Sequence, residues 1–194
     1  SFILGLIIPI GIIYLRNLLD TKLHSKKDIQ AIGLPYIGDI PISETKDKIV
    51  VGHGENNSVS ESFRLLRTNV DFMLKSKADV NSKVVFVTST IAKEGKSFIS
   101  LNLASIISLS GKKVLLIGMD LRAPKLLEYT GLSKVKGVTN YITDPELTLK
   151  DVIIEKPDDI NFDLLVSGDI PPNPSELLMH ERVVEMFKEV REMY

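Results

Sequence analysis

The sequence contains no cysteine among its 194 residues. This absence excludes a disulfide framework and a thiolate zinc site, and it fits a reducing compartment. An excess of one charge is also lacking, because 24 Lys and Arg stand against 25 Asp and Glu, for a formal net charge of −1. No global field therefore favours nucleic acid as a partner. The length suits one α/β domain with an appendage.

Charged residues are missing from an apolar run at the start of the chain, residues 2–15, which Arg16 ends. The run is shorter than the roughly 20 residues needed to span a bilayer, and it lacks the features of a signal peptide. We interpret residues 1–16 as the C-terminal half of a transmembrane helix; a buried core helix is the alternative. Basic residues follow and place this side in the cytoplasm by the positive-inside rule. They are Arg16, Lys22, Lys26 and Lys27. Residues 17–57, with two glycines and two asparagines near their end, are then expected to form a cytoplasmic linker.

The most informative stretch is Val84 to Ala104, VVFVTSTIAKEGKSFISLNLA. Its apolar start predicts a buried parallel strand, and its end predicts a helix. Between them stands Gly95-Lys96-Ser97, so the order strand, loop, GKS, helix is that of a phosphate-binding loop. The match to GxxxxGKS/T is partial, because Thr90 stands where the first glycine is usual. An ordinary strand-to-helix turn is the alternative.

A second buried strand is predicted at Lys113 to Asp120, KVLLIGMD, and it delivers an aspartate at its carboxyl end. Ligands bind at that edge of an open α/β sheet. The two strands together predict a phosphate cradle with a nearby carboxylate. The alternative for Asp120 is a helix cap or a loop salt bridge.

A phosphate-binding loop followed by strand-x-D-x-R-x-P resembles the bacterial tyrosine kinases (BY-kinases), polysaccharide co-polymerases of capsule and exopolysaccharide export. These belong to the ParA/MinD-like branch of P-loop proteins. Further matches are SESFRLLRTN at 60–69, PPNPSELL at 171–178, and the apolar start followed by LPYIGDIP at 34–41. The resemblance covers the chain from end to end. It implies an α/β P-loop NTPase fold, a parallel sheet flanked by helices, with a tyrosine kinase domain over residues 58–194.

The resemblance also implies the chemistry. ATP and Mg²⁺ are the expected cofactors, and the reaction is autophosphorylation on tyrosine that regulates polysaccharide polymerisation and export. Lys96, Asp120 and Arg122 are the expected catalytic residues, and Ser97 and Asp120 the expected metal ligands. The nucleotide-binding residues would be Ala92, Lys93, Glu94, Gly95, Lys96, Ser97 and Phe98.

A helix from Ser60 onward is predicted by an apolar stripe of Phe63, Leu66, Val70 and Met73. Its charged ridge contains Glu61, Arg64 and Arg67. On spacing alone this ridge is a solvated face with a weak ion pair. The resemblance implies instead a contact between subunits of a ring-type homo-oligomer. Other implied partners are the inner (plasma) membrane and the polysaccharide export machinery, with the kinase domain in the cytoplasm.

The sequence departs from the family pattern in two places. The usual hhhDxDxR motif has Gly118 at its first aspartate. No convincing Walker B strand is found, so we expect the fold to be truncated before that strand, with Tyr194 as its first residue, and the fragment itself to be inactive. Two alternatives stay open: a ParA/MinD-like ATPase switch, and a catalytically weak nucleotide-binding scaffold that regulates chain length.

Shorter elements complete the expectation. Residues 125–131 and 136–143 should form short helices, and residues 161–166 (NFDLLV) a third core strand. Residues 175–191 should form one amphipathic helix. Its inward-facing residues would be Leu178, Val183 or Val184, and Phe187.

Overall fold

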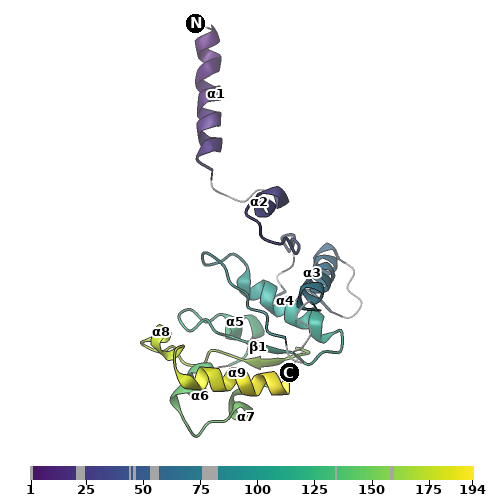
Figure 1. Ribbon diagram of the computed structural model, residues 1–194, viewed down its shortest axis with the longest axis vertical. Coiled ribbons are helices and arrows are strands. Elements are labelled where there is room, and N and C mark those ends of the chain that lie inside the picture. Colours follow the sequence, from purple (N-terminus) through teal and green to yellow (C-terminus); the bar gives the residue numbers. More distant parts are fainter. Residues whose placement is uncertain are drawn as a thin grey trace. The chain divides into compact units, whose positions relative to one another are not determined.

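A computed structural model gives the fold (Figure 1). It describes residues 2–20, 25–43, 45, 47–52, 57–75, 83–133, 135–157 and 160–194. The chain divides into two compact units, Ser1–Ile37 and Gly38–Tyr194.

The first unit contains two helices, α1 (Phe2–Leu18) and α2 (Lys26–Ala31). Helix α2 begins with a reciprocal cap, in which the Ser25 N–H donates to the Asp28 carboxylate at 2.8 Å. Within the described ranges, no helix combines the length and the apolar character that crossing a membrane requires.

The second unit alternates helices with two short strands. Its elements are α3 (Ser58–Lys75), α4 (Lys96–Ser108), β1 (Leu115–Ile117), α5 (Leu126–Thr130), α6 (Val138–Thr143), α7 (Leu149–Val152), β2 (Asp163–Leu165), α8 (Pro174–Leu177) and α9 (Glu181–Met193). The predicted strands at 113–120 and 161–166 are thereby confirmed in their central residues. The predicted short helices at 125–131 and 136–143 are confirmed as α5 and α6.

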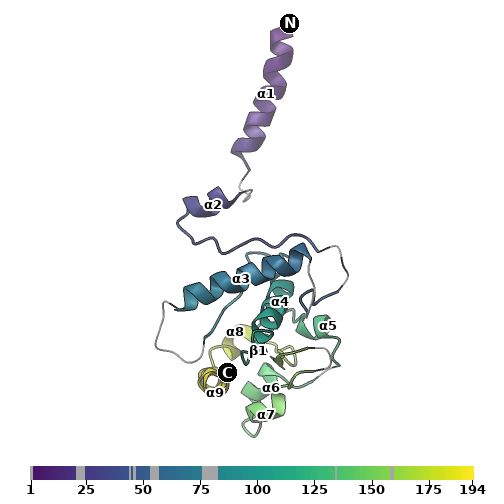
Figure 2. The same cartoon turned by 90° about the vertical axis from the view of Figure 1, so that its right-hand side faces the viewer.

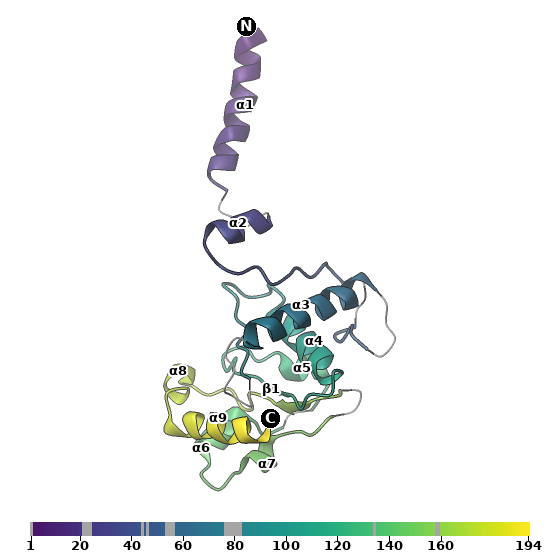
Figure 3. The same cartoon turned by 45° about the vertical axis from the view of Figure 1, so that its right-hand side comes forward.

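Strands β1 and β2 pair in parallel, with Leu116 opposite Leu164. In each view, α3 and α4 lie on one side of this small sheet, and α6, α7 and α9 on the other (Figure 3). Successive residues of β2 point to opposite faces of the sheet, so the strand contributes side chains to the cores on both sides. Leu164 packs with Leu101 of α4, whereas Leu165 belongs to the core beneath α9. The second unit is therefore an α/β layered fold.

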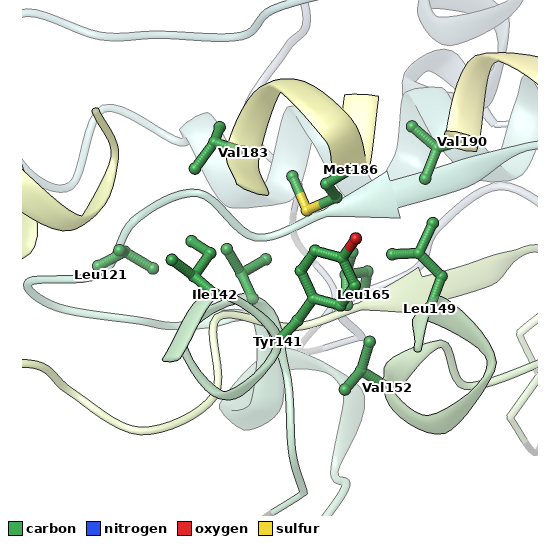
Figure 4. Close-up of a cluster of buried hydrophobic side chains, with 10 residues drawn as sticks. Leu121, Tyr141, Ile142, Leu149, Val152, Leu165, Val183, Met186 and Val190 are labelled. Carbon is green, nitrogen blue, oxygen red and sulfur yellow. The ribbon is translucent and has the colours of Figure 1, made fainter. Parts of the chain in front are cut away.

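The core beneath α9 is built from four elements and one loop (Figure 4). Met186 of α9 lies above Leu165 and Tyr141, and all three are buried. The remaining buried members are Leu121, Val138, Ile142, Leu149, Val152, Val183 and Val190. Arg182 holds α9 to the α6–α7 connection, because its guanidinium donates to the carbonyls of Asp144 and Leu147 and stacks 4.2 Å from the Tyr141 ring centroid.

Helices α3 and α4 pack against each other (Figure 2). The buried Asn102 of α4 joins them to a segment well before α3. Its side chain accepts from the Val50 N–H at 2.8 Å and donates to the Lys48 carbonyl at 2.9 Å. Ser60 of α3 donates to the Val50 carbonyl at 2.8 Å. Residues 48–51 are thereby fixed to both helices.

The predicted buried strand at the start of the phosphate-binding loop is wrong for this structure. Residues 83–89 form no strand, and Phe86 is 78% exposed. A parallel strand needs a neighbour for its N–H and C=O groups. In the described part of the chain, β1 pairs only with β2, and a cavity of about 780 Å³ lies between residues 84–88 and β1. The apolar run therefore has no strand partner among the described residues.

Two other expectations need correction. The single helix predicted over residues 175–191 is interrupted between α8 and α9, because His180 takes an extended conformation and caps α9, accepting from the Arg182 N–H. Val183 is buried as expected, whereas Val184 and Leu178 are exposed. On α3, Phe63, Leu66 and Val70 are buried, but Met73 is 43% exposed.

Candidate functional site

The loop before α4 is shaped by residues with left-handed backbones. Lys93 has φ +69° and Gly95 has φ +87°. Glycine suits this conformation, whereas a lysine adopts it at a cost of about 1–2 kcal/mol. Inside the loop, the Glu94 carboxylate accepts from the N–H groups of Thr90 and Ile91, at 2.9 and 3.2 Å. The acidic side chain therefore folds back onto the first residues of its own loop.

Lys96 and Asp120 meet at the carboxyl end of β1. The Lys96 Nζ lies 3.8 Å from the Asp120 Oδ2, and their side chains are 36% and 45% exposed. The Asp120 Oδ1 also accepts from the Ala123 N–H at 3.2 Å, which fixes the turn after the strand. The salt-bridge alternative for this aspartate is thus present together with its position at the ligand edge, whereas the helix-cap alternative is not, since Lys125 is the N-cap of α5.

Arg122 points to the other loop at this edge of the sheet. Its Nη2 donates to the Ser175 hydroxyl at 3.1 Å. The contact joins the loop after β1 to α8, which the PPNPSELL stretch forms. Sequence reasoning missed Ser175, since the two residues are 53 positions apart and no spacing rule connects them.

Some of the residues at this edge line the cavity beside β1. Lys96, Ser97 and Asp120 lie on its wall, together with Gly118 and Ser167. Ser167 is 2% exposed. It begins the loop SGDIPPNP, which follows the predicted strand at 161–166 and is therefore expected at the edge where parallel sheets bind ligands, with a structural turn as the alternative.

The remaining expected nucleotide-binding residues lie at different depths. Ala92, Lys93 and Glu94 are exposed on the loop, whereas Phe98 is half-buried and turns toward α3. Its ring meets the Phe63 ring edge-on, at a centroid distance of 5.9 Å. Phe98 thus contacts the packing between α3 and α4.

The expected oligomerisation residues all lie on α3. Glu61 and Arg64 form an ion pair one turn apart, and Arg67 is half-buried. Glu61 is well exposed, so its ion pair with Arg64 adds little to stability in water.

The donor set can hold Mg²⁺ only together with a phosphate ligand. No group of three His, Cys, Asp or Glu side chains gathers as a metal site among the described residues. Magnesium in nucleotide sites commonly takes one or two carboxylates, and phosphates and waters complete its shell. The Ser97 hydroxyl and the Asp120 carboxylate fit that pattern.

No protein-family model matches the chain. Comparison with individual proteins is more informative. Tyrosine-protein kinase Wzc of Salmonella typhi is 32% identical over 205 residues, which cover 96% of this chain and 28% of Wzc. Tyrosine-protein kinase Etk of Escherichia coli K12 is 27% identical over 216 residues, covering 100% of this chain and 29% of Etk.

Solved structures of similar fold include bacterial tyrosine kinase domains. The kinase domain of Escherichia coli ETK superposes with a TM-score of 0.78 at 27% identity, over 89% of this chain and 71% of that one. The chimerical protein CapA2B2 gives 0.75 at 29% identity, over 88% and 72%.

The chain spans under a third of the length of Wzc and Etk. Within that span the resemblance inferred from the motifs is confirmed in both sequence and fold. The chain is a homologue of the bacterial tyrosine-protein kinases.

Proposed function

We propose that the chain carries the nucleotide-binding part of an ATP-dependent protein-tyrosine autokinase that regulates capsule or exopolysaccharide polymerisation and export. The observation that carries the proposal is the approach of Lys96 to Asp120 at the carboxyl edge of the sheet, 3.8 Å apart. Relatives named tyrosine-protein kinases support the reaction type.

The chain's own groups would divide the work as phosphoryl transfer requires, where positioning and charge neutralisation dominate. Backbone amides of residues 92–97 cradle the phosphates at the start of α4, and Lys96 neutralises charge on the transferring group. Mg²⁺, held by Ser97 and Asp120, supplies further neutralisation when bound. Asp120 accepts the proton of the tyrosine hydroxyl.

Arg122 has two possible uses in this scheme. Its guanidinium can bind a phosphate oxygen bidentately, or it can serve only to hold the α8 loop through Ser175. Either use places it at the same edge as Asp120.

We also propose how the subunits assemble and where the protein is located. Glu61, Arg64 and Arg67 would contact a neighbouring subunit in a ring, so that each subunit phosphorylates the next. Residues 1–16 would contribute to the anchor in the inner membrane, with the kinase domain in the cytoplasm beside the export machinery. Replacing all three α3 residues by alanine should shift the sedimentation of the full-length protein toward the monomer without lowering its melting temperature.

A non-catalytic scaffold is the second candidate, and Gly118 is the observation that favours it. The family pattern has an aspartate there, so one carboxylate is missing from the site. A nucleotide could then serve as a structural element that sets polymer length.

One experiment separates the two candidates. The full-length protein is incubated with Mg-ATP and probed for phosphotyrosine, alongside Lys96→Met and Lys150→Met; Lys150 is exposed on α7. The kinase predicts signal in the parent and in Lys150→Met, and none in Lys96→Met. Nucleotide binding without phosphotyrosine in any variant would refute the kinase and leave the scaffold or a hydrolytic switch.

A further inference from the structure

Gly118 lies against the first residues of the loop that follows β2. Its N–H donates to the Leu165 carbonyl at 2.8 Å, which continues the parallel pairing one step beyond β1. A Cβ built at Gly118 would stand 3.2 Å from the Ser167 backbone nitrogen and 3.3 Å from the Leu126 Cδ2. Both contacts are tight, so the Ser167 backbone and the Leu126 side chain of α5 occupy the space beside position 118.

Ser167 contributes backbone atoms to this space. It is buried, its carbonyl accepts from the Thr139 N–H at 2.9 Å, and the residue lines the cavity that also holds Lys96, Ser97 and Asp120. No hydrogen bond joins its hydroxyl to any residue that the structure describes. Among the described residues, the buried oxygen atoms that lack any hydrogen-bond partner include Thr139 Oγ1 but not Ser167 Oγ. The Ser167 hydroxyl therefore stays open to the cavity, where water or a ligand can take up its hydrogen bond.

We propose that the Ser167 hydroxyl is a further group of the magnesium–phosphate site and acts from β2 beside the position where Gly118 offers no side chain. The inference rests on the proposed nucleotide function. A hydroxyl has two lone pairs that can accept a hydrogen bond from a water of the magnesium shell. Magnesium keeps several such waters when it binds with phosphates. Ser167 would thus help to orient the hydrated ion when it is bound.

The neighbouring Thr139 provides a matched control. It is also buried, its hydroxyl lacks a hydrogen-bond partner among the described residues, and its backbone pairs with Ser167. Unlike Ser167, it is not on the wall of the cavity. Thr139→Val therefore removes a comparable hydroxyl from the same place in the fold, but not from the site.

The test measures the affinity of the full-length protein for a fluorescent ADP analogue, once with excess Mg²⁺ and once with EDTA. Ser167→Ala should raise Kd about 5- to 10-fold with Mg²⁺, as expected for loss of one hydrogen bond, and leave the EDTA value within about twofold. Thr139→Val should change neither value. Without ligand, Ser167→Ala should melt at about the same temperature as the parent, because no hydrogen bond to a described residue is lost.

Each other result overturns the inference in a recognisable way. An equal loss of affinity with Mg²⁺ and with EDTA would mean that Ser167 does not act through the metal. A lower melting temperature with unchanged affinity would make its role structural. Unchanged Kd values for Ser167→Ala, with a parent that binds Mg-ADP, would sink the Ser167 inference alone. A parent that binds no nucleotide would sink the proposed function with it.

Discussion

The Lys96 ammonium and the Asp120 carboxylate lie 3.8 Å apart, although they are 24 positions apart in the chain. One begins α4 and the other follows β1, so the parallel strand-and-helix order brings them to the same edge. Both side chains are partly exposed, and such pairs contribute less than about 1 kcal/mol to folding. The pair therefore adds little to stability, so its proposed role in phosphoryl transfer can be tested separately from folding.

Asp120→Asn tests this distinction. The melting temperature should stay near that of the parent, whereas autophosphorylation should fall about 100-fold or more, because the amide cannot accept the tyrosine proton. Phosphotyrosine formation under single-turnover conditions is the measurement. Glu128→Gln is the control, since Glu128 also pairs with a lysine, Lys125, at 2.8 Å on the surface. An Asp120→Asn protein as active as the control would remove Asp120 from the chemistry.

The stability of variants at position 93 should depend on how easily the new residue adopts a left-handed backbone, because φ of Lys93 is +69°. Lys93→Gly should be more stable than Lys93→Val by about 1–2 kcal/mol, since a β-branched residue resists the left-handed region. Urea unfolding of the two variants measures the difference. The same pair at Lys150, in the first turn of α7, should show the opposite order, because glycine is the poorer helix former. Equal stabilities at position 93 would mean that the loop does not hold Lys93 in this conformation.

Asn102 should be one of the most costly polar residues to replace. Asn102→Ala leaves the Val50 N–H and the Lys48 carbonyl without their partner, and each unsatisfied group costs about 1–3 kcal/mol when buried. We expect a loss of about 2–4 kcal/mol in chemical denaturation. The exposed Asn173 serves for comparison, and its replacement by alanine should cost about 0.5 kcal/mol or less. Similar losses at the two sites would show that residues 48–51 are not fixed to α4.

The contribution of Arg182 to folding stability should come from its planar guanidinium group rather than from its charge. Lysine cannot donate to the Asp144 and Leu147 carbonyls together or stack as a plane on Tyr141, so Arg182→Lys should lower stability by about 1–2 kcal/mol. Arg191→Lys, at an exposed position late in the same helix, should leave stability within about 0.5 kcal/mol. Thermal unfolding of both variants measures these changes. If Arg182→Lys were as stable as the parent, the positive charge alone would account for the stabilisation by Arg182.

Sequence patterns identified most of the candidate site residues, because GKS and the aspartate that ends KVLLIGMD occupy fixed places in a strand–helix unit. Strands β1 and β2 were found for the same reason, each being a buried apolar run. Residues 84–87 carried an equally apolar run, yet the structure leaves them unpaired. A strand depends on its neighbour, and no periodicity within a segment shows whether that neighbour is present.

Contacts between distant loops were beyond the reach of the sequence. Ser175 meets Arg122, and Asn102 meets Val50, only because packing brings separate elements together. The break between α8 and α9 was missed for a local reason: His180 caps α9 through its ring nitrogen, although histidine is not among the usual capping residues. The place of Ser167 after a strand could be read from the sequence, but its burial and its backbone contact with Gly118 could not.

Tyr194 should make stability depend on pH in the alkaline range. Burial and the hydrogen bond that its hydroxyl donates to Asp163, at 2.7 Å, raise its pKa above the ordinary value of 10.0. The folded state thus favours the neutral phenol. The resulting stabilisation is complete below pH 10 and is lost as the pH rises above that value, because the unfolded phenol ionises first.

Comparing the parent with Tyr194→Phe isolates this effect, since the other ionisable groups are common to both proteins. Urea denaturation from about pH 8 to about pH 11 should show the parent's advantage as constant at first and then shrinking once the pH exceeds that of the free phenol. Phenylalanine keeps the ring beneath the Lys113 ammonium, which lies 4.8 Å from the ring centroid, so the cation–π contact cancels in the comparison. A difference that stayed constant over the whole range would mean that the hydroxyl is not held against Asp163 in solution.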